Sequence, residues 1–310
     1  MAEAKAASGL EALEEAAPRR ERGLWSDAFR RLIRNRLAMA GLVLLAIIVA
    51  LAFLGNYTDL VQRYDPRAQD YEVLQEGPSA AHFFGTDNLG RDNWSRVLQG
   101  VWISLQVGFG VQAIALVIGM LVGGVAALGG RLLDNLMMRF TDLAYAFPDL
   151  LFIILFRAAL AGRDWPVLSE PVPQMIVAIA FVNWVIIARL VRGQMLSLKE
   201  RDYVLAARAM GAPTSRIVFQ HMLPNTLGPV IVAITFGIPL AIFAEAVLGF
   251  IGIGVPPPTA SLGVLVGRGY TYIELNTWLV LFPAGAIGLL MLCFTFVGDG
   301  LRDALDPRAH

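Results

Sequence analysis

The sequence predicts an all-α membrane protein with several transmembrane helices. Of its 310 residues, 56% are hydrophobic and only 16% are charged, with a mean hydropathy of +0.61. A soluble domain of this size could not bury that much apolar surface. Six apolar runs approach the roughly 20 residues that a helix needs to cross a bilayer. They are residues 37–55, 103–128, 140–161, 175–190, 227–251 and 279–297. None alternates like a barrel strand, so each is expected to be a helix that pairs its own backbone groups.

The positive charges predict how these helices are oriented. With the N-terminus inside the cell, the inner segments carry 18 of the 25 Lys and Arg residues, and the outer segments carry seven. Because inner loops are enriched in Lys and Arg, both termini are expected to be cytoplasmic. The formal net charge of zero hides this separation.

The N-terminal part divides into a tail, a surface helix and the first span. Residues 1–24, rich in Ala and Glu, are predicted to be a disordered cytoplasmic tail. The segment WSDAFRRLIRNR, which starts at Trp25, is typical of an amphipathic helix lying on lipid at the inner surface; the alternative is an ordinary basic flank. A long polar segment precedes the first span and more spans follow, so the span is expected to remain as an anchor.

Two outer segments carry turn signals. Residues 56–100 include HFFGTDNLGRDNWSRVLQG, whose Gly, Asp and Asn residues predict turns followed by a short helix. The loop before the last span reads GIGVPPPTASLG, and its three consecutive prolines enforce a stiff, extended chain. Pro256 and Pro257 are therefore candidates for a lid or gate at the outer end, with a plain rigid connection as the equal alternative.

The longest inner loop between two spans predicts two short helices that meet at a bend. The first runs through ERDYVLAARAM and ends at Gly211, which adopts the left-handed conformation more easily than other residues. Pro213 then opens a second helix, TSRIVFQHM, which is expected to stop near Pro224. The predicted result is a rigid elbow in the cytoplasm.

The first helix of this elbow has small residues in its middle and charges at its edge. The small residues are Ala206, Ala207 and Ala209, and the charged ones are Arg201, Asp202 and Arg208. A slim helix flanked by charges fits a groove on a partner protein. The alternative is a surface helix that packs only on its own bundle.

The elbow resembles the cytoplasmic loop of binding-protein-dependent ABC importer permeases. The family pattern is Glu-Ala-Ala, three residues, Gly, nine residues, then Ile-x-Leu-Pro. In LAARAMGAPTSRIVFQHMLP the matching positions are Ala206, Ala207, Gly211, Leu223 and Pro224. Leu205 stands where the family often has Glu, and His221 where Ile is usual. In the family this loop is the coupling helix that docks on the ATP-binding subunit, which implies docking roles for Ala206, Ala207, Arg208, Ala209, Gly211, Ala212 and Pro213.

Further segments, in the same order as in the family, resemble the second permease type of dipeptide, oligopeptide and nickel importers. They are FGTDNLGRDNWSRVLQGVWISLQVG, RFTDLAYAFPDLL, AEAVLGFIGIGVPPPTASLG and GDGLRDALDPR. The resemblance implies the type I ABC importer permease fold in a prokaryotic inner membrane. It also implies an N-terminal extension at 25–99, a five-span core at 100–300 with its coupling loop at 199–225, and a cytoplasmic tail at 301–310.

The resemblance also implies partners. One such permease pairs with a paralogous permease, two cytoplasmic ATPases and an extracytoplasmic substrate-binding protein. The chain has no GxxxxGK[ST] phosphate loop, so ATP and Mg²⁺ are expected on the ATPase subunits, with no cofactor on this chain. Beyond these proteins and membrane lipid, no nucleic-acid partner is expected. The implied function is import of di- or oligopeptides by alternating access, with nickel, glutathione or another small peptide-like solute as alternative cargo.

Polar residues inside the spans are the candidates for the translocation pathway or its gate, because ionisable groups in hydrocarbon are costly. They are Asp149, Asn183 and Glu245. Asp149 follows Pro148 and could equally cap a helix restarted after a kink. Asn183 fits an interhelical hydrogen bond better than a pathway role. Glu245 resembles the acidic residue before the family's glycine-rich turn, and a structural or gating pair is favoured over contact with substrate.

Two other classes of protein compete with this interpretation. A secondary transporter driven by an ion gradient should show central carboxylates and inverted repeats, and the chain has few of the former and no evident repeat. A membrane enzyme should cluster His, Asp or Cys side chains. His82, His221 and His310 fall in three separate segments, and Cys293 is the single cysteine, so no metal site is expected.

Overall fold

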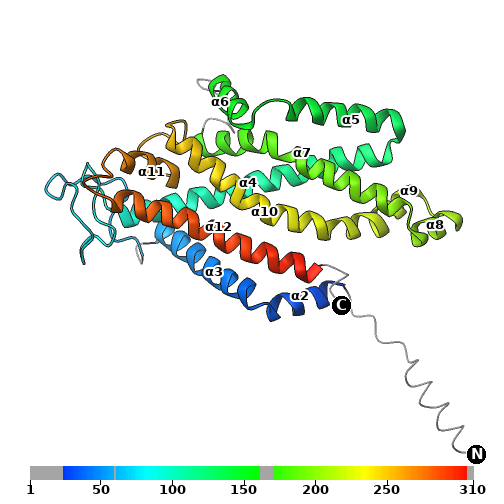
Figure 1. Ribbon diagram of the computed structural model, residues 1–310, viewed down its shortest axis with the longest axis horizontal. Coiled ribbons are helices and arrows are strands. Elements are labelled where there is room, and N and C mark those ends of the chain that lie inside the picture. Colours follow the sequence, from blue (N-terminus) through cyan, green and yellow to red (C-terminus); the bar gives the residue numbers. More distant parts are fainter. Residues whose placement is uncertain (1–23, 59–60, 161–169, 306–310) are drawn as a thin grey trace, which may run out of the picture.

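The computed structural model describes residues 24–58, 61–160 and 170–305, and this part of the chain is mostly helical (Figure 1). Of the tail predicted at 1–24, only Leu24 is among the described residues. Of the tail predicted at 301–310, residues 301–305 are described, and they form the end of the last helix. The elements in chain order are α2 (Leu24–Arg34), α3 (Arg36–Tyr57), α4 (Asn93–Leu128), α5 (Gly130–Tyr145), α6 (Asp149–Leu160), α7 (Pro171–Lys199), α8 (Asp202–Ala209), α9 (Thr214–Arg216), the π-helix η1 (Ile217–Met222), α10 (Leu223–Phe250), α11 (Leu262–Tyr270) and α12 (Trp278–Leu305).

Among the described residues, five helices are long and apolar enough to cross a membrane. They are α3, α4, α7, the continuous helix Thr214–Phe250 and α12. Their starts follow local rules: Asn35 Oδ1 accepts from two amides at the start of α3, Asp92 caps α4, and α7 opens on a proline. Five of the six predicted spans are therefore confirmed as helices, and α7 extends beyond the predicted run 175–190 at both ends.

The third predicted span is not one helix. The described part of run 140–161 contains the end of α5, a break at residues 146–148, and α6. Pro148 has no N–H to donate and disfavours helical geometry in the residue before it, so the helix stops and restarts. At 16 and 12 residues, α5 and α6 are each shorter than a bilayer-spanning helix. The prediction of a single helix was wrong here, and the count of six spans stays a prediction.

The centre of the bundle is the pair α4 and α7, which pack against each other along their lengths (Figure 1). Their backbones approach closely because α4 presents glycine at the contact. A Cβ atom built on Gly123 would lie 2.4 Å from the carbonyl oxygen of Ala188 and 2.9 Å from Val191 Cβ. Glycine-rich α4 therefore packs directly on the backbone of α7, as small residues permit in membrane helices.

The remaining helices pack on this pair or on one another, and the two ends of the bundle differ in structure. α2 and α3 lie against α12, with Ala28 buried and Phe29 and Ile33 exposed on α2. The helix predicted from WSDAFRRLIRNR is thus confirmed. α8 and α9 project at one end of the bundle, and the loop 61–92 gathers with α11 at the other end (Figure 1). We call these the elbow end and the loop end.

Candidate functional site

The elbow consists of α8, a tight turn and α9. Gly211 has a φ of +81°, the left-handed conformation that favours glycine. The amide of Gly211 donates to the carbonyl of Arg208, and the amide of Ala212 donates to the carbonyl of Ala207, both at 3.0 Å. This pair of bonds is the Schellman motif that closes a helix C-terminus. Pro213 then leads in extended conformation into α9, as predicted.

One face of the elbow holds it to the bundle. Val204 and Ala207 of α8 are buried in one cluster with Ile217, Val218 and Met195. Burial of these apolar side chains contributes the usual hydrophobic stabilisation and sets the angle of α8. The elbow is therefore a supported projection of the bundle.

The opposite face of the elbow is open. Five of the predicted docking residues are exposed: Ala206, Arg208, Ala209, Gly211 and Pro213. Ala212 is half-buried, and Ala207 points into the chain's own core, where it holds α8 rather than facing outward.

Sequence reasoning missed the large apolar side chains on this open face. Met210 is 82% exposed, Leu205 is 46% exposed, and Tyr203 is exposed beside them. Their signal was available, because Leu205 and Met210 flank the alanines in the sequence. Exposed side chains of this kind, gathered away from the spans, are typical of an interaction site.

The second helix of the elbow does not stop near Pro224, so that prediction was wrong. α9, η1 and α10 form one continuous helix, Thr214–Phe250. The π-helix η1 immediately precedes Leu223 and Pro224. Pro224 lies in the first turn of α10, where the backbone N–H that proline lacks is not needed for an α-helical hydrogen bond. The preceding π turn is wider than an α-helical turn and accommodates the proline ring. The elbow is consequently joined without interruption to α10.

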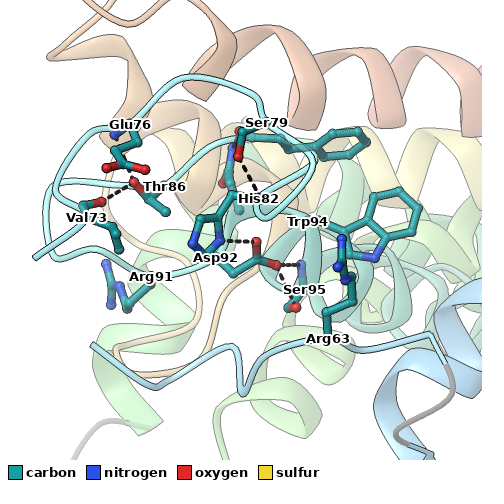
Figure 2. Close-up of polar contacts among 12 residues, drawn as sticks. Arg63, Val73, Glu76, Ser79, His82, Thr86, Arg91, Asp92, Trp94 and Ser95 are labelled. Atoms are coloured by element: carbon teal, nitrogen blue, oxygen red, sulfur yellow. Dashed lines mark hydrogen bonds and ion pairs between the residues drawn. The ribbon is translucent and has the colours of Figure 1, made fainter. Parts of the chain in front are cut away.

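At the loop end, the segment around Thr86 to Ser95 is a hydrogen-bonded scaffold (Figure 2). Asp92 accepts from the amide and hydroxyl of Ser95 at 2.8 and 2.7 Å, and lies 2.9 Å from His82 Nδ1. Thr86 receives the amide of Glu76 at 2.9 Å and donates to the carbonyl of Val73. These bonds fix the loop on the start of α4. The turn-rich sequence thus forms an ordered cap on the bundle.

A cleft of about 740 Å³ opens at this loop end. Its walls are the end of α10, the prolines 256–258, α11 and four loop residues: Gln69, Asn88, Leu89 and Arg91. Pro256 and Pro257, the predicted gate residues, are exposed on its rim. Arg157 of α6 holds the proline loop from the other side, donating to the carbonyl of Gly254 at 3.0 Å.

The three polar residues predicted for the pathway are not brought together, and none of them lines this cleft. Asp149 is the exposed first residue of α6. Asn183 donates to the carbonyl of Ile179 one turn back in α7, and no interhelical bond of its side chain is seen within the described part of the chain, so the expected interhelical bond stays a prediction.

Glu245 is fully buried and joins three elements. Its Oε2 accepts from the hydroxyl of Ser104 on α4 at 2.9 Å, and Ser261, which caps α11, interacts with the same carboxyl group. Its Oε1 has no hydrogen-bond partner among the described residues. This arrangement fits the structural or gating pair that was favoured over direct contact with substrate.

Two ion pairs connect α5 to α7. Arg192 Nη2 lies 2.6 Å from Asp134 Oδ2, and Arg189 lies 2.8 Å from Asp142. The Arg192 guanidinium holds the pKa of Asp134 below its usual value. Within the described ranges, no group of three or more His, Cys, Asp or Glu side chains could hold a metal ion.

Comparison with known proteins relates these features to a transport family. The chain is 40% identical to the oligopeptide transport system permease protein OppC of Bacillus subtilis (strain 168), over 92% of this chain and 90% of that protein. It is 42% identical to the dipeptide transport system permease protein DppC of the same organism, over 91% of this chain and 85% of that protein.

Among solved structures, an inward-facing MetNI methionine ABC transporter matches with a TM-score of 0.55 at 24% identity, covering 68% of this chain and 96% of that one. This likeness concerns the fold. Residues 23–78 match the N-terminal TM domain of oligopeptide transport permease C. Residues 115–310 match the model of the binding-protein-dependent transport system inner membrane component. With relatives this similar along most of its length, the chain belongs to the family of binding-protein-dependent ABC transport permeases, multi-pass components of the bacterial inner membrane.

Proposed function

We propose that this chain is a permease subunit of an ATP-driven importer that moves di- and oligopeptides into the cell by alternating access. The observation that carries the proposal is the elbow, where a left-handed Gly211 sets α8 at the end of the bundle with Leu205 and Met210 exposed. The names of the relatives, oligopeptide and dipeptide permeases, support peptide as the cargo.

The partners follow from the same proposal. The chain pairs with a paralogous permease as a heterodimer, and peptide passes between the two membrane subunits. Two P-loop ATPases bind ATP and Mg²⁺ and receive the elbows, while this chain binds no cofactor. A substrate-binding protein docks at the loop end. Both termini lie in the cytoplasm, the extension at 25–99 precedes the core at 100–300, and α2 lies on lipid headgroups.

Coupling requires that the docking contact distinguish two states. A contact of equal free energy in the outward-open and inward-open forms could shift no equilibrium between them. The elbow meets the mechanical requirement, because it is continuous with α10 and packed on α7 through the cluster around Val204. Movement of a docked ATPase would therefore reach the two spans directly.

Purification of the tagged chain from its native membrane in mild detergent tests the proposal. We expect a second permease and two P-loop ATPases to co-purify, and reconstituted liposomes to take up peptide when ATP and the binding protein are supplied. Uptake of nickel or glutathione but not peptide would change the cargo alone. Active transport by this chain without any ATPase would refute the proposal in favour of a gradient-driven transporter.

A further inference from the structure

The wall of the loop-end cleft contains an unusual accumulation of arginine. Arg91 and Arg268 line the cleft, and Arg96 lies in a small recess beside it with Arg268. Arg96 is 0% exposed, Arg91 is buried and Arg268 is partly buried. Three guanidinium groups thus share one corner of the molecule, although this side of the chain is the one predicted to be poorer in positive charge.

Asp87 is the carboxylate that faces these three positive charges. Asp87 accepts from Arg91 Nε at 2.8 Å and lies 2.6 Å from its Nη2, so it is committed to Arg91. Arg96 Nε lies 3.7 Å from the same carboxylate, and that nitrogen and Nη2 have no hydrogen-bond partner among the described residues. Within the described part of the chain, Arg268 forms no ion pair. The cluster therefore retains a positive excess.

That excess is unfavourable in the isolated chain. Arg91 and Arg268 both repel the charge on Arg96. Burial lowers the pKa of Arg268, and Arg91 lowers it further by repulsion. Among the described residues Arg268 lacks a carboxylate of its own, and a carboxylate is the group that the planar donors of a guanidinium bind best.

The shape of the cleft decides between two sources of that carboxylate. The loop residues Gln69, Asn88 and Leu89 form one wall, so the cleft lies at the outer surface. Its floor is the seam between α10 and α11, where a Cβ on Gly267 would lie 2.7 Å from the carbonyl oxygen of Phe250. The two helices are in direct contact there, so the cleft does not continue between them. A recess that is closed on this side favours docking of a protein side chain from outside over passage of peptide through this part of the chain.

We propose that this cleft receives an acidic side chain, Asp or Glu, from the extracytoplasmic binding protein, and that Arg268 pairs with it while Arg91 and Arg96 add to the positive potential of the cleft. The inference rests on the proposed importer function. Charge complementarity of this kind accelerates association and fixes orientation more than it adds affinity, which suits a partner that must dock and leave in every cycle.

The experiment measures association of the binding protein with the complete transporter in lipid nanodiscs. The probe is the binding protein recovered with the complex. The variants are Arg268→Gln and, as a matched control, Arg67→Gln, an exposed arginine of the outer loop that does not line this cleft. Both remove one positive charge from the same end of the molecule, so a difference between them isolates the cleft.

We expect Arg268→Gln to slow association about tenfold at low salt and to reduce its salt dependence, while Arg67→Gln stays within about twofold of wild type. Thermal stability of Arg268→Gln should equal or exceed that of wild type, because the substitution removes repulsion from the cluster. A structural role for Arg268 would instead lower stability.

Equal association rates for the two variants would overturn the inference. So would an unchanged rate combined with a raised KM for peptide, since that result would assign the cleft to the carboxylate of the peptide itself. Should Arg268→Gln fail to assemble, a benzoylphenylalanine at Thr271 on the cleft wall provides the test, and absence of a cross-link to the binding protein would refute docking there. Wild-type uptake of peptide in the same preparation would keep the proposed function intact in every case.

Discussion

Replacing Gly211 with alanine tests the elbow most directly. The residue has a φ of +81°, and a Cβ built on it meets no heavy atom within 4 Å. The cost of the substitution is therefore conformational, about 1 kcal/mol for a non-glycine residue in the left-handed region. That amount changes an equilibrium by about fivefold, so the Schellman turn should loosen and α8 should lose its fixed orientation.

The assay compares peptide uptake and ATP hydrolysis in proteoliposomes supplied with the binding protein. We expect Gly211→Ala to reduce the stimulation of ATP hydrolysis by loaded binding protein about fivefold, with the folded bundle intact. Gly193→Ala is the matched control, because Gly193 lies within α7 with equally open space around it. Gly211→Asn should recover part of the coupling, since Asn tolerates the left-handed conformation.

Two results would refute this reasoning. Wild-type coupling in Gly211→Ala would show that the turn geometry does not matter for transport. Equal damage from Gly211→Asn and Gly211→Ala would show that any side chain is harmful there, and the backbone explanation would fail.

Three further predictions follow from other contacts. Leu205→Ala should weaken retention of the ATPase subunits in detergent by about 1 to 2 kcal/mol of binding free energy, because it removes an exposed apolar contact; unchanged retention would show that Leu205 does not touch the ATPase. Since Arg192 lowers the pKa of Asp134, the ion pair stabilises the attachment of α5 at neutral pH, and that contribution is lost as the pH falls through the folded-state pKa. Protection factors of the α5 amides, which are corrected for the intrinsic pH dependence of exchange, should therefore fall under acid in wild type, and Asp134→Asn should reduce this response. Gly123→Ala should destabilise the bundle by about 2 kcal/mol in thermal unfolding, whereas Gly124→Ala, with 3.9 Å to its nearest neighbour, should be close to neutral.

Local signals accounted for much of the fold. Hydropathy located five long helices, and the elbow followed from Gly211 and Pro213 because backbone preferences at such positions act over a few residues. The same rules failed at Pro224, where a preceding π-helix lets the helix continue. They also failed at 140–161, where hydropathy indicated one span and Pro148 divides it. Apolar composition indicates that a segment lies in a membrane or a core, but it does not indicate whether the helix is continuous. Whether a proline breaks a helix depends on its position in the helical turn.

The candidate sites show the same division. The elbow and most of the exposed residues proposed for docking could be predicted because the elbow's small residues, charges and bend are consecutive in the chain. The sequence alone thus determined that the protein is a helical membrane protein with an elbow at one end, since hydropathy, charge bias and turn chemistry are properties of neighbouring residues.

Only the tertiary structure decided which polar groups meet. Glu245 finds Ser104 across 141 positions of sequence, and Arg268 joins Arg91 and Arg96 around one carboxylate. Such contacts depend on how α4, α10 and α11 pack against one another, and no local pattern specifies them. The charged cleft is therefore a product of helix packing, because its arginines come from segments that the chain brings together only when folded.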